Sequence, residues 1–186
     1  MTRPIENLIR GVVTQAVTRI AEFNRDHRRA DGPNPYLSGI HQPMTAEFTL
    51  TDLAVSGTIP SDLDGSYLRN GPNPVRPPNP ATHHWFTGTG MVHGVRIEGG
   101  RARWYRNRWI RGREVSEALG EPPAPGIRTE GFDAPNTNVI GHAGSLWAIV
   151  EAGGNPVRIG PELDTIAHDP FGGTLTHAFS AHPHLD

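Results

Sequence analysis

Glycine and proline recur along almost the whole chain, and their frequency constrains the fold more than any other feature. There are 22 glycines and 18 prolines among 186 residues, about a fifth of the chain. Proline fixes φ and removes a backbone donor, whereas glycine admits positive φ, so both residues interrupt helices and mark turns. The apolar stretches between them are short. This pattern predicts an all-β fold of short strands joined by tight turns.

Two hairpins can be recognised within this pattern. Val95 and Ile97 alternate with polar residues, and Gly99-Gly100 then provides a tight turn into "RARWYRNRWI". The segment "NTNVI" is joined to "SLWAIVE" through "GHAG", and "AGGNP" turns the chain again into "VRI". The proline-dense stretches "NGPNPVRPPNP" and "GEPPAPG" are predicted to be loops, because proline cannot donate to a strand ladder. Antiparallel strands at this spacing are typical of β-propeller blades.

The segment 3–29 is the exception, because its apolar residues recur at the spacing of one helix face. Pro4 suits a first helical turn, and Gly32-Pro33 stops the pattern. Arginines fill many of the other positions, so the helix is predicted to be amphipathic and basic. It either contacts an anionic membrane surface as a peripheral element or docks on its own domain. The predicted domains are therefore an N-terminal helix at 1–32 and a β-rich segment at 33–186.

The overall charge and the available residue types exclude several kinds of partner and site. A formal net charge of −2 offers no bulk attraction to nucleic acid. With no cysteine, neither a disulfide nor a thiolate metal site can form, so a metal would be bound by carboxylates or by the ten histidines. No apolar run reaches the roughly 18 residues of a membrane span, and no secretory signal is recognisable. The expected location is the cytoplasm.

Three histidines occur in the stretch "HHWFTGTGMVHGVRI". His83 and His84 are adjacent, so in an extended segment their side chains point to opposite faces and are poorly placed to share one metal. His93 follows beyond two glycines. The simplest interpretation is a packed loop that leads into a strand.

The ends of two later segments carry more specific candidates. In "SLWAIVE" both strand faces are largely apolar, so Glu151 is expected to be buried beside a partner such as the N–H of a metal-bound imidazole. In "SAHPHLD", Pro183 biases His182 towards extended geometry, and His182 and His184 can then face one metal. Neutral imidazole is a good ligand for iron or zinc. The alternatives are a solvated carboxylate and a solvated tail.

Taken together, four stretches resemble the carotenoid cleavage oxygenase family, which includes carotenoid- and stilbene-cleaving dioxygenases and the retinal pigment epithelium isomerase. They occur in the order and spacing of that family. They are "GTIPSDLDGSYLRNGPNP" (57–74), "HWFTGTGMVHGVRI" (84–97), "NTNVIGHAGSLWAIVEAGGNPVRI" (136–159) and "SAHPHLD" (180–186).

The resemblance implies the N-terminal part of a seven-bladed β-propeller. Its axis would hold a non-haem Fe(II), bound by four histidines, that activates O₂ to cleave conjugated C=C bonds. The substrates would be apolar polyenes, namely carotenoids, apocarotenoids or stilbene-like compounds. By the same resemblance His182 is the first iron ligand and His184 only its neighbour. Glu151 orients an iron-bound histidine through its ring N–H, and His93 is structural.

Members of this family run to several hundred residues, and the resemblance places the other three iron ligands beyond the matched segments. The chain is therefore expected to be an N-terminal fragment that is inactive alone. The main alternative is a non-enzymatic β-rich binding module with a membrane-docking helix and structural histidines. A third possibility is self-assembly through open sheet edges, which clusters His182 from several copies. The sequence indicates neither the particular substrate nor the oligomeric state.

Overall fold

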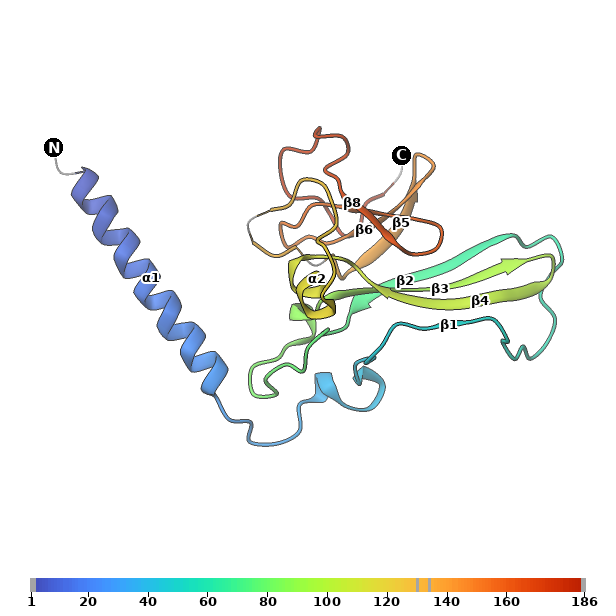
Figure 1. Ribbon diagram of the computed structural model, residues 1–186, viewed down its shortest axis with the longest axis horizontal. Coiled ribbons are helices and arrows are strands. Elements are labelled where there is room, and N and C mark those ends of the chain that lie inside the picture. The colour runs from blue at the N-terminus through green and yellow to red at the C-terminus, as the bar shows by residue number, and fades with distance from the viewer. Residues whose placement is uncertain (1–2, 130, 134, 185–186) are drawn as a thin grey trace. The chain divides into compact units, whose positions relative to one another are not determined.

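The computed structural model describes the backbone of residues 3–129, 131–133 and 135–184, with side chains described from Val13 onward. The chain forms two compact units, which we describe separately. One comprises Met1–Gln42 with Pro77–His84, and the other comprises Pro43–Arg76 with Trp85–Asp186. Figure 1 labels their helices and strands.

Helix α1 (Arg3–His27) dominates the first unit and lies where the sequence predicts a helix over residues 3–29. Its C-terminus is held by a side chain from a distant loop. The Asn79 amide donates to the carbonyl oxygens of Arg25, Asp26 and Arg28 at 2.8, 3.1 and 3.2 Å. Carbonyls at a helix end lack intrahelical partners, so this side chain supplies the missing donors.

Most of the described apolar side chains of α1 are exposed. Val13, Val17, Ile20 and Phe23 are between 55 and 61 % exposed. Two short 3-10 turns follow, η1 (Pro35–Leu37) and η2 (Gly39–His41). Within the described residues, no helix combines the length and the apolar character that crossing a membrane requires.

The second unit begins with an antiparallel sheet, here called sheet A, with strand order β1-β4-β3-β2 (Figure 1). Gly99 and Gly100, with φ of 57° and 71°, form the tight turn between β3 and β4 that the sequence predicts. The prediction of a loop from residue 70 is wrong, because β2 continues to Pro72, which pairs with Gly90. Proline is tolerated there because it ends the strand. The strands are β1 (Thr49–Leu50), β2 (Gly65–Pro72), β3 (Gly90–Glu98) and β4 (Arg101–Trp109).

The other four strands form sheet B, an antiparallel meander in the order β5-β6-β7-β8. The predicted hairpin between "NTNVI" and "SLWAIVE" is confirmed, with its turn at Ala143 and Gly144, which have φ of 49° and 72°. A four-stranded meander of this kind is the unit from which propeller blades are built. The strands are β5 (Asn138–His142), β6 (Ser145–Ile149), β7 (Val157–Ile159) and β8 (Thr165–His168).

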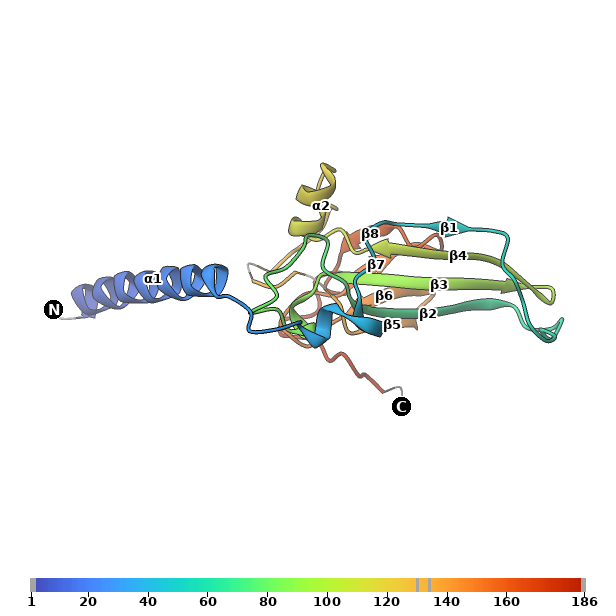
Figure 2. The same cartoon turned by 90° about the horizontal axis from the view of Figure 1, so that it is seen from below.

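The two sheets lie in two layers with an apolar core between them (Figure 2). The buried members of this core are Val92, Ile110, Ala148, Val157, Ile159 and Leu163. Burying one such aliphatic side chain contributes about 1.5–3 kcal/mol. Neighbouring residues on a strand point to opposite faces, so Met91 leaves this core and packs with Trp109 and Val115 in a second cluster.

The second unit also contains a helix that the sequence analysis did not identify. Helix α2 (Arg113–Leu119) ends at Gly120, whose φ of 67° provides a left-handed cap. Helix α2 has only about two turns, which is too short to show helical periodicity in the sequence. Val115 packs in the second cluster and so anchors the helix there. A further 3-10 turn, η3 (Trp85–Thr87), precedes β3.

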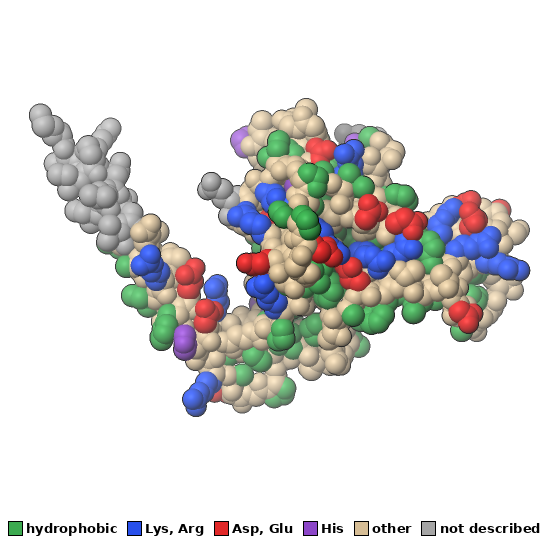
Figure 3. All heavy atoms as spheres, in the orientation of Figure 1, with side chains coloured by type: hydrophobic (Ala, Val, Ile, Leu, Met, Phe, Trp, Pro, Cys, Tyr) green, Lys and Arg blue, Asp and Glu red, His purple; other side chains and the backbone are tan. Residues whose placement is uncertain are grey.

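Charged side chains of both signs are interspersed on the surface of this unit (Figure 3). Arg111 pairs with Glu47 and Glu121. Burial lowers the pKa of Arg111, but its hydrogen bonds to these two carboxylates outweigh that effect and raise the pKa above its ordinary value. Arg106 likewise pairs with Glu162.

Candidate functional site

The loop 180–184, here called the His182 loop, has a fixed backbone and an exposed imidazole. The His182 N–H donates to Ser180 Oγ at 3.1 Å. Ala181 is fully buried, and its carbonyl oxygen accepts a hydrogen bond from Asn138 Nδ2 at 3.0 Å. The side chain of His182 is nevertheless 72 % exposed. The anchors therefore position the main chain and leave the ring accessible.

Glu151 lies beside His182, but in surroundings that differ from the prediction. The expectation that Glu151 is buried is wrong, because its side chain is 61 % exposed. Strand β6 ends at Ile149, so Glu151 falls in the turn beyond the buried part of the strand. Its Oε2 atom is 3.7 Å from His182 Nε2, which is longer than a hydrogen bond. An exposed pair at this distance contributes little to stability.

The His182 loop supplies one possible metal ligand and not a complete metal site. His182 offers an accessible imidazole, a side chain that suits iron as a ligand. In the part of the chain that the structure describes, no group of three or more His, Cys, Asp or Glu side chains is placed to hold a metal ion. Further ligands would have to come from outside the described residues.

An apolar hollow of about 560 Å³ is lined in part by Pro183 and His184, which follow His182 in the chain. Phe171 packs on both Trp147 and Phe179, with ring centroids 4.7 and 5.0 Å apart. The two histidines of the His182 loop have different surroundings. His184 lines the hollow, whereas His182 faces Glu151. Its lining residues are Ile140, Gly141, His142, Phe171, Phe179, Pro183 and His184.

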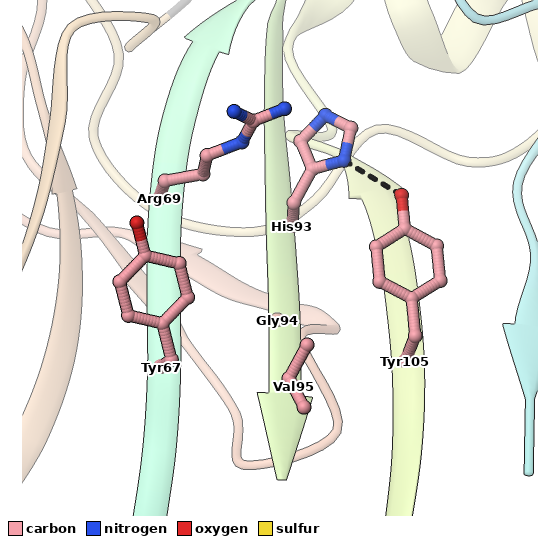
Figure 4. A pocket seen from close by; sticks show the side chains of 6 residues that line it. All are labelled: Tyr67, Arg69, His93, Gly94, Val95 and Tyr105. Carbon is pink, nitrogen blue, oxygen red and sulfur yellow. Dashed lines mark hydrogen bonds between the residues drawn. The ribbon is translucent and has the colours of Figure 1, made fainter. Parts of the chain in front are cut away.

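The other histidines singled out in the sequence lie elsewhere. His83 and His84 belong to the first unit, where the ring of His84 lies 4.7 Å from that of Tyr36. Burial and the neighbouring His84 lower the pKa of His83. His93 lies on β3 and bonds Tyr105 (Figure 4). The structure therefore brings together Glu151 and His182 alone among the candidates that lie in the described residues.

The asparagines that hold this region could not be identified from the sequence. Asn138 Oδ1 accepts from Val139 N at 2.8 Å while its amide holds Ala181. Asn70 on β2 donates to the carbonyl oxygens of Pro135 and Asn138 at 2.9 and 3.1 Å, and so ties sheet A to the start of sheet B. The only signal in the sequence was a polar side chain next to an apolar strand, which is too common to single out.

The fold and these features define a mostly β protein with few helices, in which an exposed histidine, a carboxylate and an apolar hollow occur in one unit. The family model described as "Retinal pigment epithelial membrane protein" (RPE65) matches residues 41–186. This match covers most of the chain, which therefore belongs to that family. The family predicted from the four sequence stretches is confirmed.

Curated and solved relatives agree with this assignment. The chain is 53 % identical over 163 residues to a carotenoid cleavage oxygenase of Mycobacterium tuberculosis, covering 84 % of this chain and 32 % of the relative. The lignostilbene dioxygenase of Pseudomonas brassicacearum superposes with a TM-score of 0.70 at 26 % identity, covering 86 % of this chain and 35 % of that one. Cobalt-substituted Synechocystis apocarotenoid oxygenase gives a TM-score of 0.66 at 29 % identity, covering 84 % and 36 %. The chain thus spans about a third of the length of these relatives.

Proposed function

We propose that this chain is part of an iron(II)-dependent dioxygenase that cleaves conjugated C=C bonds of carotenoids, apocarotenoids or stilbene-like compounds with O₂. The observation that carries the proposal is the 53 % identity to a protein named carotenoid cleavage oxygenase. The structural similarity to a lignostilbene dioxygenase supports the wider substrate class. The same similarities do not favour a non-enzymatic binding module.

We further propose that sheets A and B are blades of a seven-bladed propeller and that His182 is one iron ligand. When bound, the iron would activate O₂ for the cleavage. The chain's own contribution is to hold the His182 main chain through Ala181 and Ser180 while the imidazole stays accessible. Glu151 is proposed to accept a hydrogen bond from the N–H of an iron-bound histidine, which would orient that ring. The described third of the enzyme would be inactive alone, because one imidazole cannot retain the metal.

The apolar hollow supports an apolar substrate. Its volume of about 560 Å³ lies within the range of ligand pockets, and aromatic side chains supply much of its wall. Phe171 and Phe179 would pack on a conjugated chain and exclude water from it. Pro183 and His184, the two residues that follow the proposed iron ligand in the chain, line the hollow.

The proposal can be tested by joining this sequence to the part of the M. tuberculosis relative that it does not cover. We expect the joined protein to bind one iron per chain, by elemental analysis, and to cleave a carotenoid or a stilbene in the presence of O₂. His182→Ala should abolish iron binding, whereas the matched control His184→Ala should retain most of it. Equal loss from both changes contradicts the assignment of His182. A joined protein that folds without binding iron contradicts the proposed iron dependence.

We also propose that α1 contacts an anionic membrane surface peripherally, from the cytoplasm. Its exposed apolar residues Val17, Ile20 and Phe23 and its arginines support this role. We expect the chain to sediment with vesicles containing phosphatidylserine and not with purely zwitterionic vesicles, and Ile20→Glu to reduce the bound fraction. Binding that is indifferent to lipid charge contradicts the proposal.

A further inference from the structure

The peptide group between Ala181 and His182 has both of its polar atoms engaged. The Ala181 carbonyl oxygen accepts a hydrogen bond from Asn138 Nδ2 at 3.0 Å. The His182 N–H donates to Ser180 Oγ at 3.1 Å. Pro183 follows and biases the backbone of His182 towards extended geometry. These restraints act on both sides of the His182 Cα atom, so together they fix the direction in which the side chain leaves the main chain.

The orientation of the Asn138 amide follows from its two partners. Its Oδ1 atom accepts from the Val139 N–H at 2.8 Å, and a main-chain N–H can only donate. Nδ2 is therefore the end that faces the Ala181 carbonyl oxygen, which can only accept. An asparagine at this position satisfies both backbone groups at once, which an ionised aspartate or an alanine cannot do.

Asn138 is itself held by both sheets. It is the first residue of β5 and pairs with Ile149 of β6, which is fully buried. Its carbonyl oxygen accepts from the amide of Asn70 on β2 at 3.1 Å, and the same amide donates to the Pro135 carbonyl oxygen at 2.9 Å. The side chain of Asn138 therefore extends from a backbone that strands of sheets A and B keep in place.

The bond from Asn138 is the main polar link to the His182 loop. Among the residues that the structure describes, it is the only hydrogen bond that joins residues 180–184 to the rest of the chain. The contact between His182 and Glu151, at 3.7 Å, is too long to replace it. Ala181 is fully buried, so without Asn138 its carbonyl oxygen would lose its partner and could not turn to water. The contact is complete within this chain and does not depend on what else covers the loop.

We propose that Asn138, assisted by Ser180, is a positioning residue that sets the direction in which the His182 imidazole meets the iron. The inference rests on the proposed role of His182 as an iron ligand. Groups that orient metal ligands commonly contribute about 10- to 100-fold to metal affinity. Here the restraint acts through the main chain, since the exposed ring of His182 makes no hydrogen bond to a described residue.

The test uses this chain joined to the part of the M. tuberculosis relative that it does not cover, loaded with Fe(II) or Co(II) in the absence of O₂. Asn138→Asp keeps an acceptor for the Val139 N–H but removes the donor to Ala181, and we expect it to weaken iron binding by about tenfold. Its added negative charge attracts a cation, so charge alone predicts the opposite change. Competition with a chelator measures the affinity. The absorption spectrum of the Co(II) form reports the ligand geometry and should change.

Asn155→Asp is the matched control, because it makes the same change of charge and also removes an amide bond to a carbonyl oxygen, that of Ile127. It should alter iron affinity by less than about twofold and leave the Co(II) spectrum unchanged. Thermal unfolding of the metal-free proteins separates positioning from a general loss of stability. A purely structural role of Asn138 would lower Tm without altering the Co(II) spectrum.

Iron binding in Asn138→Asp that is as tight as in Asn155→Asp overturns the proposal, and so does an unchanged Co(II) spectrum. If Asn138→Asp does not fold, Ser180→Ala decides, because it removes the other bond to the same peptide group. Weaker iron binding in Ser180→Ala supports the positioning role, and unchanged binding overturns it. A joined protein that binds no iron before any substitution contradicts the proposed function itself, and the positioning role falls with it.

Discussion

His93 lies in the middle of strand β3 with its ring bonded to Tyr105, whereas His182 lies in a loop with 72 % of its side chain exposed. The pKa of His93 is lowered by burial and by a neighbouring arginine. For His182 the fixed part is the main chain, which Ala181 and Ser180 anchor. Both histidines belong to the same unit, so the difference arises from local packing.

The comparison shows two ways in which a β-sheet protein can present an imidazole. A position within a strand fixes the side chain and its partners before any ligand arrives. A position in an anchored loop fixes only the backbone, so the imidazole can join ligands from elsewhere. The first suits a fixed contact within the sheet, and the second suits one corner of a larger site.

The largest expected effect tests the rigidity of the strand that carries His93. A Cβ atom at Gly90, the first residue of β3, would lie 2.1 Å from the carbonyl oxygen of Pro135. Backbone atoms cannot yield cheaply, so Gly90→Ala should lower the free energy of unfolding by about 3 kcal/mol, the upper end of the usual cost of overpacking. Urea unfolding at pH 7 measures it. Gly141→Ala on β5 is the matched control, since nothing lies within 4 Å of that Cβ, and it should change stability by less than about 0.5 kcal/mol. Equal losses of stability in the two variants would show that the close contact at Gly90 does not make this strand unusually rigid.

A smaller effect is expected at the anchor of the His182 loop. Asn138→Ala removes the bond to Ala181 and should lower the free energy of unfolding by about 1–2 kcal/mol. It should also speed amide hydrogen exchange in residues 180–184, which mass spectrometry can follow. The comparable variant Asn155→Ala removes an exposed bond to Ile127 and should leave this exchange unchanged. If Asn138→Ala also leaves it unchanged, the loop is held by other contacts.

The smallest effect concerns pH and follows from the lowered pKa of His93. The unfolded chain takes up a proton near pH 6.5, while the folded imidazole still resists protonation. Stability is therefore complete above about pH 6.5 and falls as the pH drops through the lowered folded pKa. The buried His168 acts in the same direction, because burial lowers its pKa despite a bond to the Arg111 carbonyl.

His93→Gln keeps a neutral hydrogen-bonding group and should make stability less dependent on pH between 7.5 and 5. Urea unfolding at several pH values measures the slope, and His168→Gln should reduce it separately. A slope that is unchanged in both variants would show that other groups control the acid response.

Part of this structure could be predicted from the sequence because the determining interactions are local. Gly99-Gly100 and the alternation of Val95 and Ile97 located one hairpin, and the apolar periodicity of residues 3–29 located α1. The four family stretches led to His182 and Glu151. Helix α2 was missed because seven residues show too little periodicity, and the end of β2 was assigned to a loop because residues 70–72 open a proline-dense stretch.

The sequence by itself determined the β3–β4 and β5–β6 hairpins, their turns and the family, because backbone preferences and residue order act over short distances. Only the tertiary structure decided which side chains meet and how exposed they are. It placed Glu151 in solvent, 3.7 Å from His182, and it aligned Arg69, His93 and Tyr105 across three strands. These outcomes depend on where strands end and how they pair, which is set by packing between segments distant in the chain.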